Sequence, residues 1–235
     1  MKLTRPRGGA ANRRGAEDRT AIKVIRTREI RMMEKFLPKG NGSVVLDVGC
    51  GTGFHLALLE NGVGVDRNKA AVKSAEGKGK PVAIASAEEL PFSNECVDSA
   101  ICFFGVLNLC DLGASLREMN RVLKWKGCVL ASAASIWDRS YRFREKLFAD
   151  REPEEGYFIA DGERARVHLF TREEITKTSM EHGFKVEHFD SLFSLQKPRW
   201  HAGLEPQHIL KLGLERLVPA KDFGGVYFIV LRKVF

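Results

Sequence analysis

This chain lacks a long apolar segment. No run approaches the roughly 18 residues that span a bilayer, and the first residues contain no apolar core of a secretory signal. We therefore expect a cytoplasmic protein with no membrane insertion. Cysteine is also sparse, with five residues and no Cys-x-x-Cys pair. Because metal sites need clustered ligands at short spacing, we predict no metal site and expect small, reduced and mostly buried cysteines.

Asp and Glu are scarce at the start of the chain. Residues 1–39 hold twelve Lys or Arg against four Asp or Glu, so they carry the whole net charge of +8 and the rest is neutral. Residues 1–18 are rich in Gly, Arg and Asn, which predicts a disordered basic arm, and an apolar pattern then predicts a helix over 20–37. The arm fits contact with nucleic acid or another polyanion as well as it fits a solvated tail, and Glu17 and Asp18 argue against a mitochondrial presequence.

From residue 43 onward, short β-branched runs alternate with helical patterns. The runs predict strands at residues 43–48, 63–65, 82–85, 97–104 and 127–134. Strands that are apolar on both faces and separated by helices predict a parallel sheet covered on two sides. Two late strands, at 184–189 and 226–234, predict an antiparallel strand near one edge. The expected fold is a Rossmann-like, doubly wound, mostly parallel α/β sheet of seven strands, in one domain over residues 19–235.

Residues 136–170 interrupt this alternation with many Arg and aromatic side chains. A helix followed by a loop or small hairpin fits their composition. We interpret the segment either as a lid that binds the substrate or as a solvated amphipathic helix. The next helix is predicted to begin at Thr171, which forms a capping box with Glu174, and to stop at Gly183.

The most informative motif is Asp-Val-Gly-Cys-Gly-Thr-Gly at residues 47–53, where Asp47 lies at the end of a predicted buried strand and is followed by a glycine turn. Glycines permit positive φ and let a ligand approach the main chain. The glycine spacing departs from the G-x-G-x-x-G turn that binds pyrophosphate, because Phe54 takes the sixth position. A carboxylate before the turn would also repel pyrophosphate and attract a cationic ligand. The motif therefore favours S-adenosylmethionine, with its ammonium and sulfonium groups, over NAD.

Further polar residues follow the next two predicted strands. Asp66 ends the second strand, where a carboxylate can accept two ribose hydroxyls. The third strand is followed by Ser86, Ala87 and Glu88, whose backbone and small side chains would line the binding site of an adenine. Taken singly, Asp47 fits a turn cap and Asp66 an exposed acid equally well, and their order along the chain favours a ligand site.

Five segments in order resemble the successive motifs of class I S-adenosylmethionine-dependent methyltransferases, most closely the type 11 subgroup that contains the ubiquinone/menaquinone biosynthesis enzymes. The segments are DVGCGTG, GVDRN, SAEELPF, VDSAICFF and LREMNRVLKWKGCVL. The resemblance covers residues 43–134 continuously and 171–190 more loosely. It implies methyl transfer with S-adenosylmethionine as cofactor. The cofactor contacts that it implies are Asp47, Gly49, Cys50, Gly51, Asp66, Arg67, Ser86, Ala87, Glu88 and Phe103.

The chain departs from the family pattern at three places. Ser86 stands where an Asp usually contacts the adenine amino group, and Lys-Trp-Lys-Gly at 124–127 replaces Lys-Pro-Gly. Asn108 lies in a segment that often reads Leu-His-His, which argues against histidine-assisted chemistry there. His168 has no evident acid or base partner in the sequence, so no catalytic residue is assigned.

A sulfonium is already an activated methyl donor, so the enzyme need only align the acceptor and exclude water, and no catalytic dyad is required. The Asn/Asp-Pro-Pro-Tyr/Phe and Pro-Cys motifs of base-amine and cytosine-C5 methylation are absent. The neutral body favours a small-molecule acceptor. Three alternatives stay open: RNA methylation guided by residues 1–39, as in the similar-looking tRNA wobble-uridine methyltransferases, a cofactor-binding partner protein without transferase activity, and an NAD-dependent dehydrogenase.

Overall fold

The computed structural model describes residues 10–39, 42–135, 155–160, 163–192 and 225–235. Its helices are α1 (Ala10–Phe36), α2 (Lys69–Glu76), α3 (Leu112–Val122) and α5 (Arg172–Glu181), with short 3-10 turns η1 (Leu56–Leu58) and η2 (Val106–Leu109). Its strands are β1 (Val45–Val48), β2 (Gly62–Asp66), β3 (Val82–Ile84), β4 (Val97–Cys102), β5 (Leu123–Ala134), β6 (Glu155–Ala160), β7 (Glu163–His168), β8 (Phe184–Leu192) and β9 (Val226–Lys233).

Seven strands form one sheet in the order β3-β2-β1-β4-β5-β9-β8. The strands from β3 to β5 pair in parallel, and β9 lies antiparallel between β5 and β8. This arrangement confirms the predicted Rossmann-like sheet with an antiparallel strand near one edge. The strand order reverses between β1 and β4, and open α/β sheets bind their ligands at the carboxyl ends of the strands beside such a reversal.

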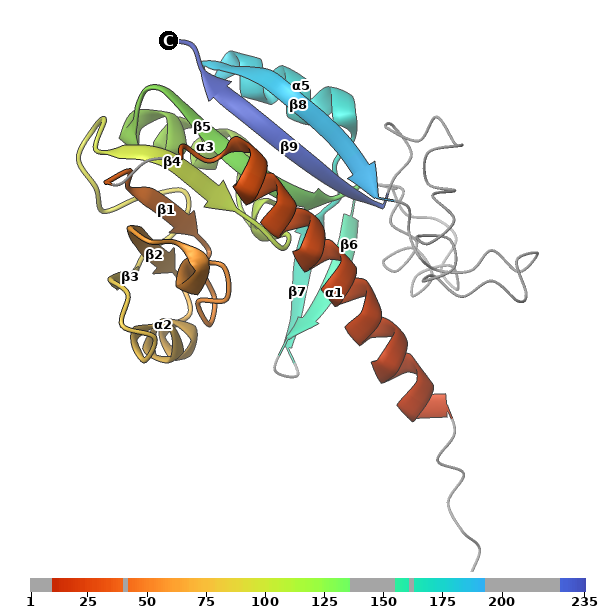
Figure 1. The fold of residues 1–235 in the computed structure, drawn as a ribbon. Coiled ribbons are helices and arrows are strands. Elements are labelled where there is room, and N and C mark those ends of the chain that lie inside the picture. Colours follow the sequence, from red (N-terminus) through yellow and green to blue (C-terminus); the bar gives the residue numbers. More distant parts are fainter. Residues whose placement is uncertain (1–9, 40–41, 136–154, 161–162, 193–224) are drawn as a thin grey trace, which may run out of the picture.

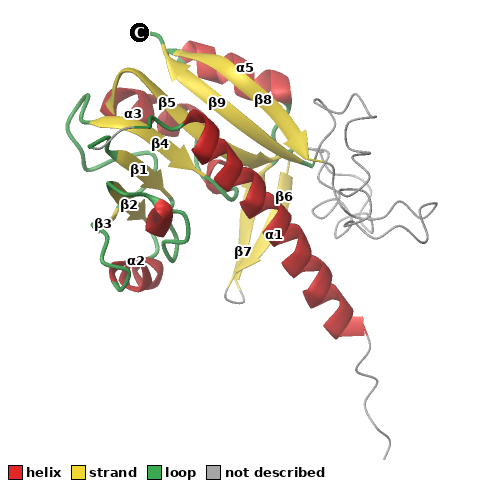
Figure 2. Cartoon of the chain, viewed as in Figure 1, coloured by secondary structure: helices red, strands yellow, loops and turns green. Residues whose placement is uncertain are grey.

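Helices cover both faces of the sheet, as Figures 1 and 2 show. On one face, Met32 and Met33 of α1 join a core cluster with Leu130 and Phe228. On the other face, the apolar stripes of α3 and α5 pack into a second cluster. Apolar side chains on both sides explain why the central strands read as continuous hydrophobic runs in the sequence.

Helix α1 begins earlier than the sequence predicts. It starts at Ala10 instead of residue 20, so residues 10–18, which were expected to be disordered, are helical. Ala, Arg and Glu have high helix propensity, and their sum outweighs the cost of Gly15. The first turns of α1 extend beyond the sheet (Figure 1). Because these turns do not pack on the sheet, they need no apolar stripe facing it.

Part of the interrupting segment 136–170 lies in a two-stranded antiparallel sheet made by β6 and β7, as the predicted hairpin requires. Residues 136–154 lie outside the described residues. The roles of residues 1–18 as a separate arm and of 136–170 as a lid stay predictions.

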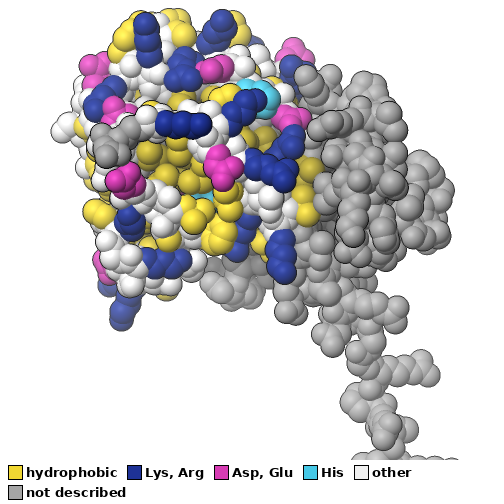
Figure 3. Space-filling view, in the orientation of Figure 1, with side chains coloured by type: hydrophobic (Ala, Val, Ile, Leu, Met, Phe, Trp, Pro, Cys, Tyr) yellow, Lys and Arg dark blue, Asp and Glu magenta, His cyan; other side chains and the backbone are white. Residues whose placement is uncertain are grey.

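The face that α1 crosses carries mixed charges. Figure 3 shows Lys and Arg side chains interspersed with Asp and Glu, around a group of apolar side chains at the centre of the view. In the part of the chain that the structure describes, no helix is long and apolar enough to cross a bilayer.

Candidate cofactor site

Asp47 is a buried acid near the end of β1, with 2% of its surface exposed. Its Oδ2 atom has no hydrogen-bond partner among the described residues. Burial raises the pKa of the Asp47 carboxyl to about 7, although nearby His55 and the backbone amide of Leu56 oppose this rise. A buried carboxylate with a free oxygen is costly unless it is neutral or meets a cation, so Asp47 is suited to bind a positively charged group.

The glycine turn after β1 is fixed against β2. The amides of Gly49 and Cys50 donate to the carbonyl oxygen of Val65 at 2.8 and 2.9 Å. Gly49 has φ 72°, and a Cβ there would lie 2.3 Å from a methyl group of Val106, so no larger residue fits. Gly51 has φ 53° with open space around it, so its backbone is accessible to a ligand.

Asp66 lies at the end of β2, directly beside this turn. Its two carboxylate oxygens accept hydrogen bonds from the amides of Gly51 and Asn68, both at 2.8 Å. Each oxygen keeps a further lone pair for a ligand hydroxyl. The neighbouring Arg67 side chain is exposed. The structure thus brings together two acids, Asp47 and Asp66, around one glycine turn, as predicted.

Cys50 is an inert turn residue. It is buried, and burial together with nearby Asp47 and Asp66 raises the pKa of its thiol to about 12. A thiol in this state supplies almost no thiolate near neutral pH. This agrees with the expectation that the cysteines are small, reduced and mostly buried.

The segment after β3 contains the predicted adenine-facing residues. The Ser86 hydroxyl accepts a hydrogen bond from the amide of Glu88 at 3.3 Å, and Ala87 is buried. The Glu88 carboxylate accepts from the amide of Asp111 at 2.6 Å, so it holds the start of α3. Glu88 therefore offers a ligand its backbone more readily than its carboxylate.

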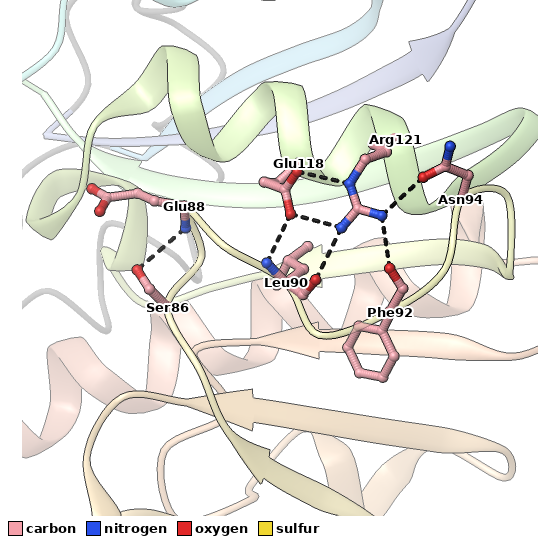
Figure 4. Close-up of polar contacts among 7 residues, drawn as sticks. All are labelled: Ser86, Glu88, Leu90, Phe92, Asn94, Glu118 and Arg121. Carbon is pink, nitrogen blue, oxygen red and sulfur yellow. Dashed lines mark hydrogen bonds and ion pairs between the residues drawn. The ribbon is translucent and has the colours of Figure 1, made fainter.

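An ion pair on α3 holds the same segment in place (Figure 4). Glu118 and Arg121 pair at 2.8 Å, and Glu118 also accepts from the amide of Leu90. Arg121 donates to the carbonyl oxygens of Leu90 at 2.9 Å and Phe92 at 2.7 Å. The pair satisfies main-chain groups that belong to no strand, and so it positions the loop that follows Ser86.

Replacing Arg121 with methionine is expected to lower the free energy of unfolding by about 1–3 kcal/mol, because the loop carbonyls and the Glu118 carboxylate lose their donor. Cofactor affinity should fall several-fold as the loop loses its position. Urea denaturation and cofactor titration measure the two effects. Arg117→Met is the matched control, since Arg117 is exposed on the same helix; equal effects of the two changes would contradict the positioning role.

The segment after β4 has a strained backbone. Phe103 is buried, whereas Phe104 is 46% exposed and has φ 62°, which is unfavourable for a bulky residue. The amide of Phe104 donates to the Ser132 hydroxyl of β5 at 2.8 Å and lies 3.2 Å from Oε1 of Glu29. These contacts hold Phe104 at the carboxyl end of the sheet.

Glu29 of α1 is fully buried, and the sequence analysis did not single it out. Its Oε1 accepts from the Ser132 hydroxyl at 2.6 Å. Its Oε2 lies 3.0 Å from Nε2 of His55, which is ion-pair distance without hydrogen-bond alignment. Glu29 therefore ties α1 to β5 and to the loops after β1 and β4. The available signal was its position on the apolar stripe of the helix, four residues after Ile25 and three before Met32.

His168 has a partner that the sequence did not reveal. Its Nε2 lies 2.7 Å from Oε1 of Glu174. Thr171 caps α5 by accepting from the amide of Glu174 at 3.1 Å, as predicted, but the Glu174 carboxylate reaches His168. Asn108 donates to the carbonyl oxygens of His168 and Ala134, so the pair lies beside the carboxyl end of β5.

Comparisons with known proteins agree with this geometry. Residues 46–131 match the family model of a type 11 methyltransferase domain. The chain is 35% identical over 179 residues to uncharacterized protein MJ1252 of Methanocaldococcus jannaschii, covering 70% of this chain and 71% of that protein. A putative S-adenosylmethionine-dependent methyltransferase from Listeria monocytogenes has the same fold, with a TM-score of 0.65 at 15% identity over 88% of this chain and 97% of that one.

Two further relatives match a shorter part of the chain. The ubiquinone/menaquinone biosynthesis C-methyltransferase of Nitrosospira multiformis is 32% identical over 125 residues, which are 49% of this chain and 51% of that protein. The tRNA (carboxymethyluridine(34)-5-O)-methyltransferase of Arabidopsis thaliana is 35% identical over 102 residues, covering 41% of this chain and 24% of that protein. The motif order, the sheet topology and these matches show that the chain belongs to the class I S-adenosylmethionine-dependent methyltransferases of the type 11 kind.

Proposed function

We propose that this enzyme binds S-adenosylmethionine across the strand reversal and transfers its methyl group to a small molecule. Asp47 would hold the cofactor ammonium, Asp66 the ribose hydroxyls, and residues 86–88 the adenine. The glycine turn and Phe103 would enclose the methionyl part. The observation that carries this placement is the buried Asp47 carboxyl, whose Oδ2 has no partner among the described residues.

The acceptor site is proposed beside η2 and the carboxyl end of β5. Helix α1 crosses this end of the sheet and is tied there by Glu29, so the site is partly covered. The charges on this face are mixed (Figure 3), whereas enzymes acting on RNA usually concentrate positive charge around the site. A partly covered site on a face of mixed charge favours a small acceptor. The Nitrosospira relative is named as a C-methyltransferase of ubiquinone/menaquinone biosynthesis.

Methylation of RNA is the second candidate. The basic helix α1 projects beyond the sheet (Figure 1), and the Arabidopsis relative is named as a tRNA methyltransferase. A variant that lacks residues 1–18 separates the two proposals, because it removes basic residues but keeps Arg26 and Glu29. We expect unchanged labelling of small molecules from methyl-labelled cofactor. Loss of that labelling after truncation would contradict the small-molecule proposal.

In the proposed reaction the cofactor supplies the activated methyl group. The described residues orient the acceptor in line with it and exclude water, which accounts for much of the rate. His168, whose ring is held by Glu174, is the candidate base for an acceptor that must lose a proton.

His168→Gln is expected to lower turnover by about 100-fold while cofactor affinity stays unchanged, because general bases contribute about that factor. Single-turnover label transfer and cofactor titration measure the two quantities. His182→Gln is a control on another histidine, at the end of α5. A parallel loss of thermal stability and activity in His168→Gln would show that the His168–Glu174 pair is structural instead.

A further inference from the structure

Arg26 of α1 is a half-buried cation that pairs with no carboxylate of the described residues. Its guanidinium carbon lies 4.1 Å from the centre of the Phe54 ring and 5.7 Å from that of Phe104. Phe54 directly follows the glycine turn, and Phe104 follows Phe103 at the end of β4. The stacking therefore holds a positive charge between the two loops that flank the candidate cofactor site.

Neighbouring contacts fix Arg26 in this place. Glu29 lies three residues later on the same face of α1; its Oε1 accepts from Ser132 and from the amide of Phe104, and its Oε2 lies 3.0 Å from Nε2 of His55. Glu29 thus anchors the helix turn that carries Arg26. Stacking also leaves the edge of a guanidinium free, and this planar fork of N–H donors matches a carboxylate.

The position of Arg26 relative to Asp47 indicates which anion it meets. Asp47 pairs through its backbone with β4, and the His55 ring packs against Phe103 just after β4, with 5.0 Å between the ring centres. Arg26 stacks on Phe54, the residue immediately before His55. The Asp47 carboxyl and the Arg26 guanidinium therefore lie on elements that meet at the end of the glycine turn. An amino acid carries its ammonium and its carboxylate on the same carbon, so groups that bind them must be close neighbours.

We propose that Arg26 binds the carboxylate of the amino-acid end of S-adenosylmethionine, while Asp47 binds its ammonium. This inference rests on the cofactor placement proposed above. The site then recognises the zwitterion as a whole, and docking of α1 completes the cofactor site.

The test compares S-adenosylmethionine with decarboxylated S-adenosylmethionine, which keeps the ammonium, sulfonium and nucleoside. Affinities are measured by calorimetric titration of the full chain and of Arg26→Gln. We expect the unsubstituted protein to bind S-adenosylmethionine about 10- to 100-fold more tightly than the decarboxylated compound, as a charge-assisted bidentate contact provides. Arg26→Gln should bind both compounds equally, at the level of the decarboxylated one.

Arg31→Gln is the matched control, because Arg31 is exposed on the same helix, and it should keep the full preference. Arg26→Lys retains the charge but loses the planar fork of donors, so its preference for S-adenosylmethionine should be intermediate. This variant also tests the inference if Arg26→Gln does not fold. An unchanged preference in Arg26→Gln, or an equal loss for both compounds, would overturn the inference. Absence of any S-adenosylmethionine binding to the unsubstituted protein would instead overturn the proposed cofactor placement.

Discussion

Replacing Asp47 with asparagine is expected to weaken S-adenosylmethionine binding about 10- to 100-fold and to remove its pH dependence. Burial raises the pKa of the Asp47 carboxyl to about 7, so the acid must lose its proton to bind a cation. Below pH 7 the affinity of the unsubstituted protein should therefore fall by about tenfold for each pH unit. Asparagine has no proton to lose, and its affinity should stay level over the same range.

Calorimetry between pH 5.5 and 7.5, in two buffers with different ionisation enthalpies, measures both the affinity and the number of protons released. We expect close to one proton released near pH 6 for the unsubstituted protein and none for Asp47→Asn. Glu60→Gln is a control with an exposed acid near the same turn. A pH profile that is identical in the unsubstituted protein and Asp47→Asn would contradict the assignment of the ammonium to Asp47.

The same pKa shift predicts the pH dependence of stability. The folded protein holds the proton of Asp47 more tightly than the unfolded chain, whose pKa is near 3.8. The resulting stabilisation is complete below pH 3.8 and is lost as the pH rises through 7, at most about 4 kcal/mol in total. Without cofactor, Asp47→Asn should therefore melt at a higher temperature than the unsubstituted protein at pH 8.

Glu29→Ala is expected to lower the free energy of unfolding by about 2–4 kcal/mol, the largest loss of stability that we predict for a substitution. The change leaves the buried Ser132 hydroxyl and the His55 ring without their shared partner and opens a cavity under α1. Urea denaturation measures the loss. Cofactor affinity should also fall, because the turn of α1 that carries Arg26 is no longer anchored.

Glu34→Ala is the matched control for this experiment. Glu34 is exposed on the same helix, so its replacement should change the free energy of unfolding by less than about 0.5 kcal/mol. Glu29→Gln should lie between the two variants, because an amide oxygen still accepts from Ser132. A loss in Glu29→Ala no larger than that in Glu34→Ala would show that Glu29 does not anchor the helix.

The parts of the site that follow local patterns could be predicted from the sequence. Asp47 lies one residue before the end of β1 and Asp66 ends β2, both strands have a visible apolar run, and parallel pairing brings strand ends together without further information. The glycine spacing likewise predicted that a ligand approaches the main chain there. The parallel pairing of the strands from β3 to β5 follows from the same alternation of strands and helices, whereas the order of the strands in the sheet was not predicted.

The missed features depend on contacts between distant segments. Glu29 lies 103 residues from Ser132 in the sequence, and nothing local shows that its carboxylate is buried there. Glu174 was correctly placed in a capping box, but the competing contact with His168 appears only when β7 and α5 are packed together. The early start of α1 at Ala10 reflects helix propensity without apolar periodicity, which our pattern analysis did not weigh.

Incubation of the pure protein with methyl-labelled S-adenosylmethionine and a cell extract tests most directly whether this enzyme methylates a small molecule. The RNA, protein and small-molecule fractions are then separated and counted, with Asp47→Asn as the blank. We predict label in the small-molecule fraction, at least tenfold above the blank. Label confined to RNA or protein, or no label despite measured cofactor binding, would contradict the proposed function.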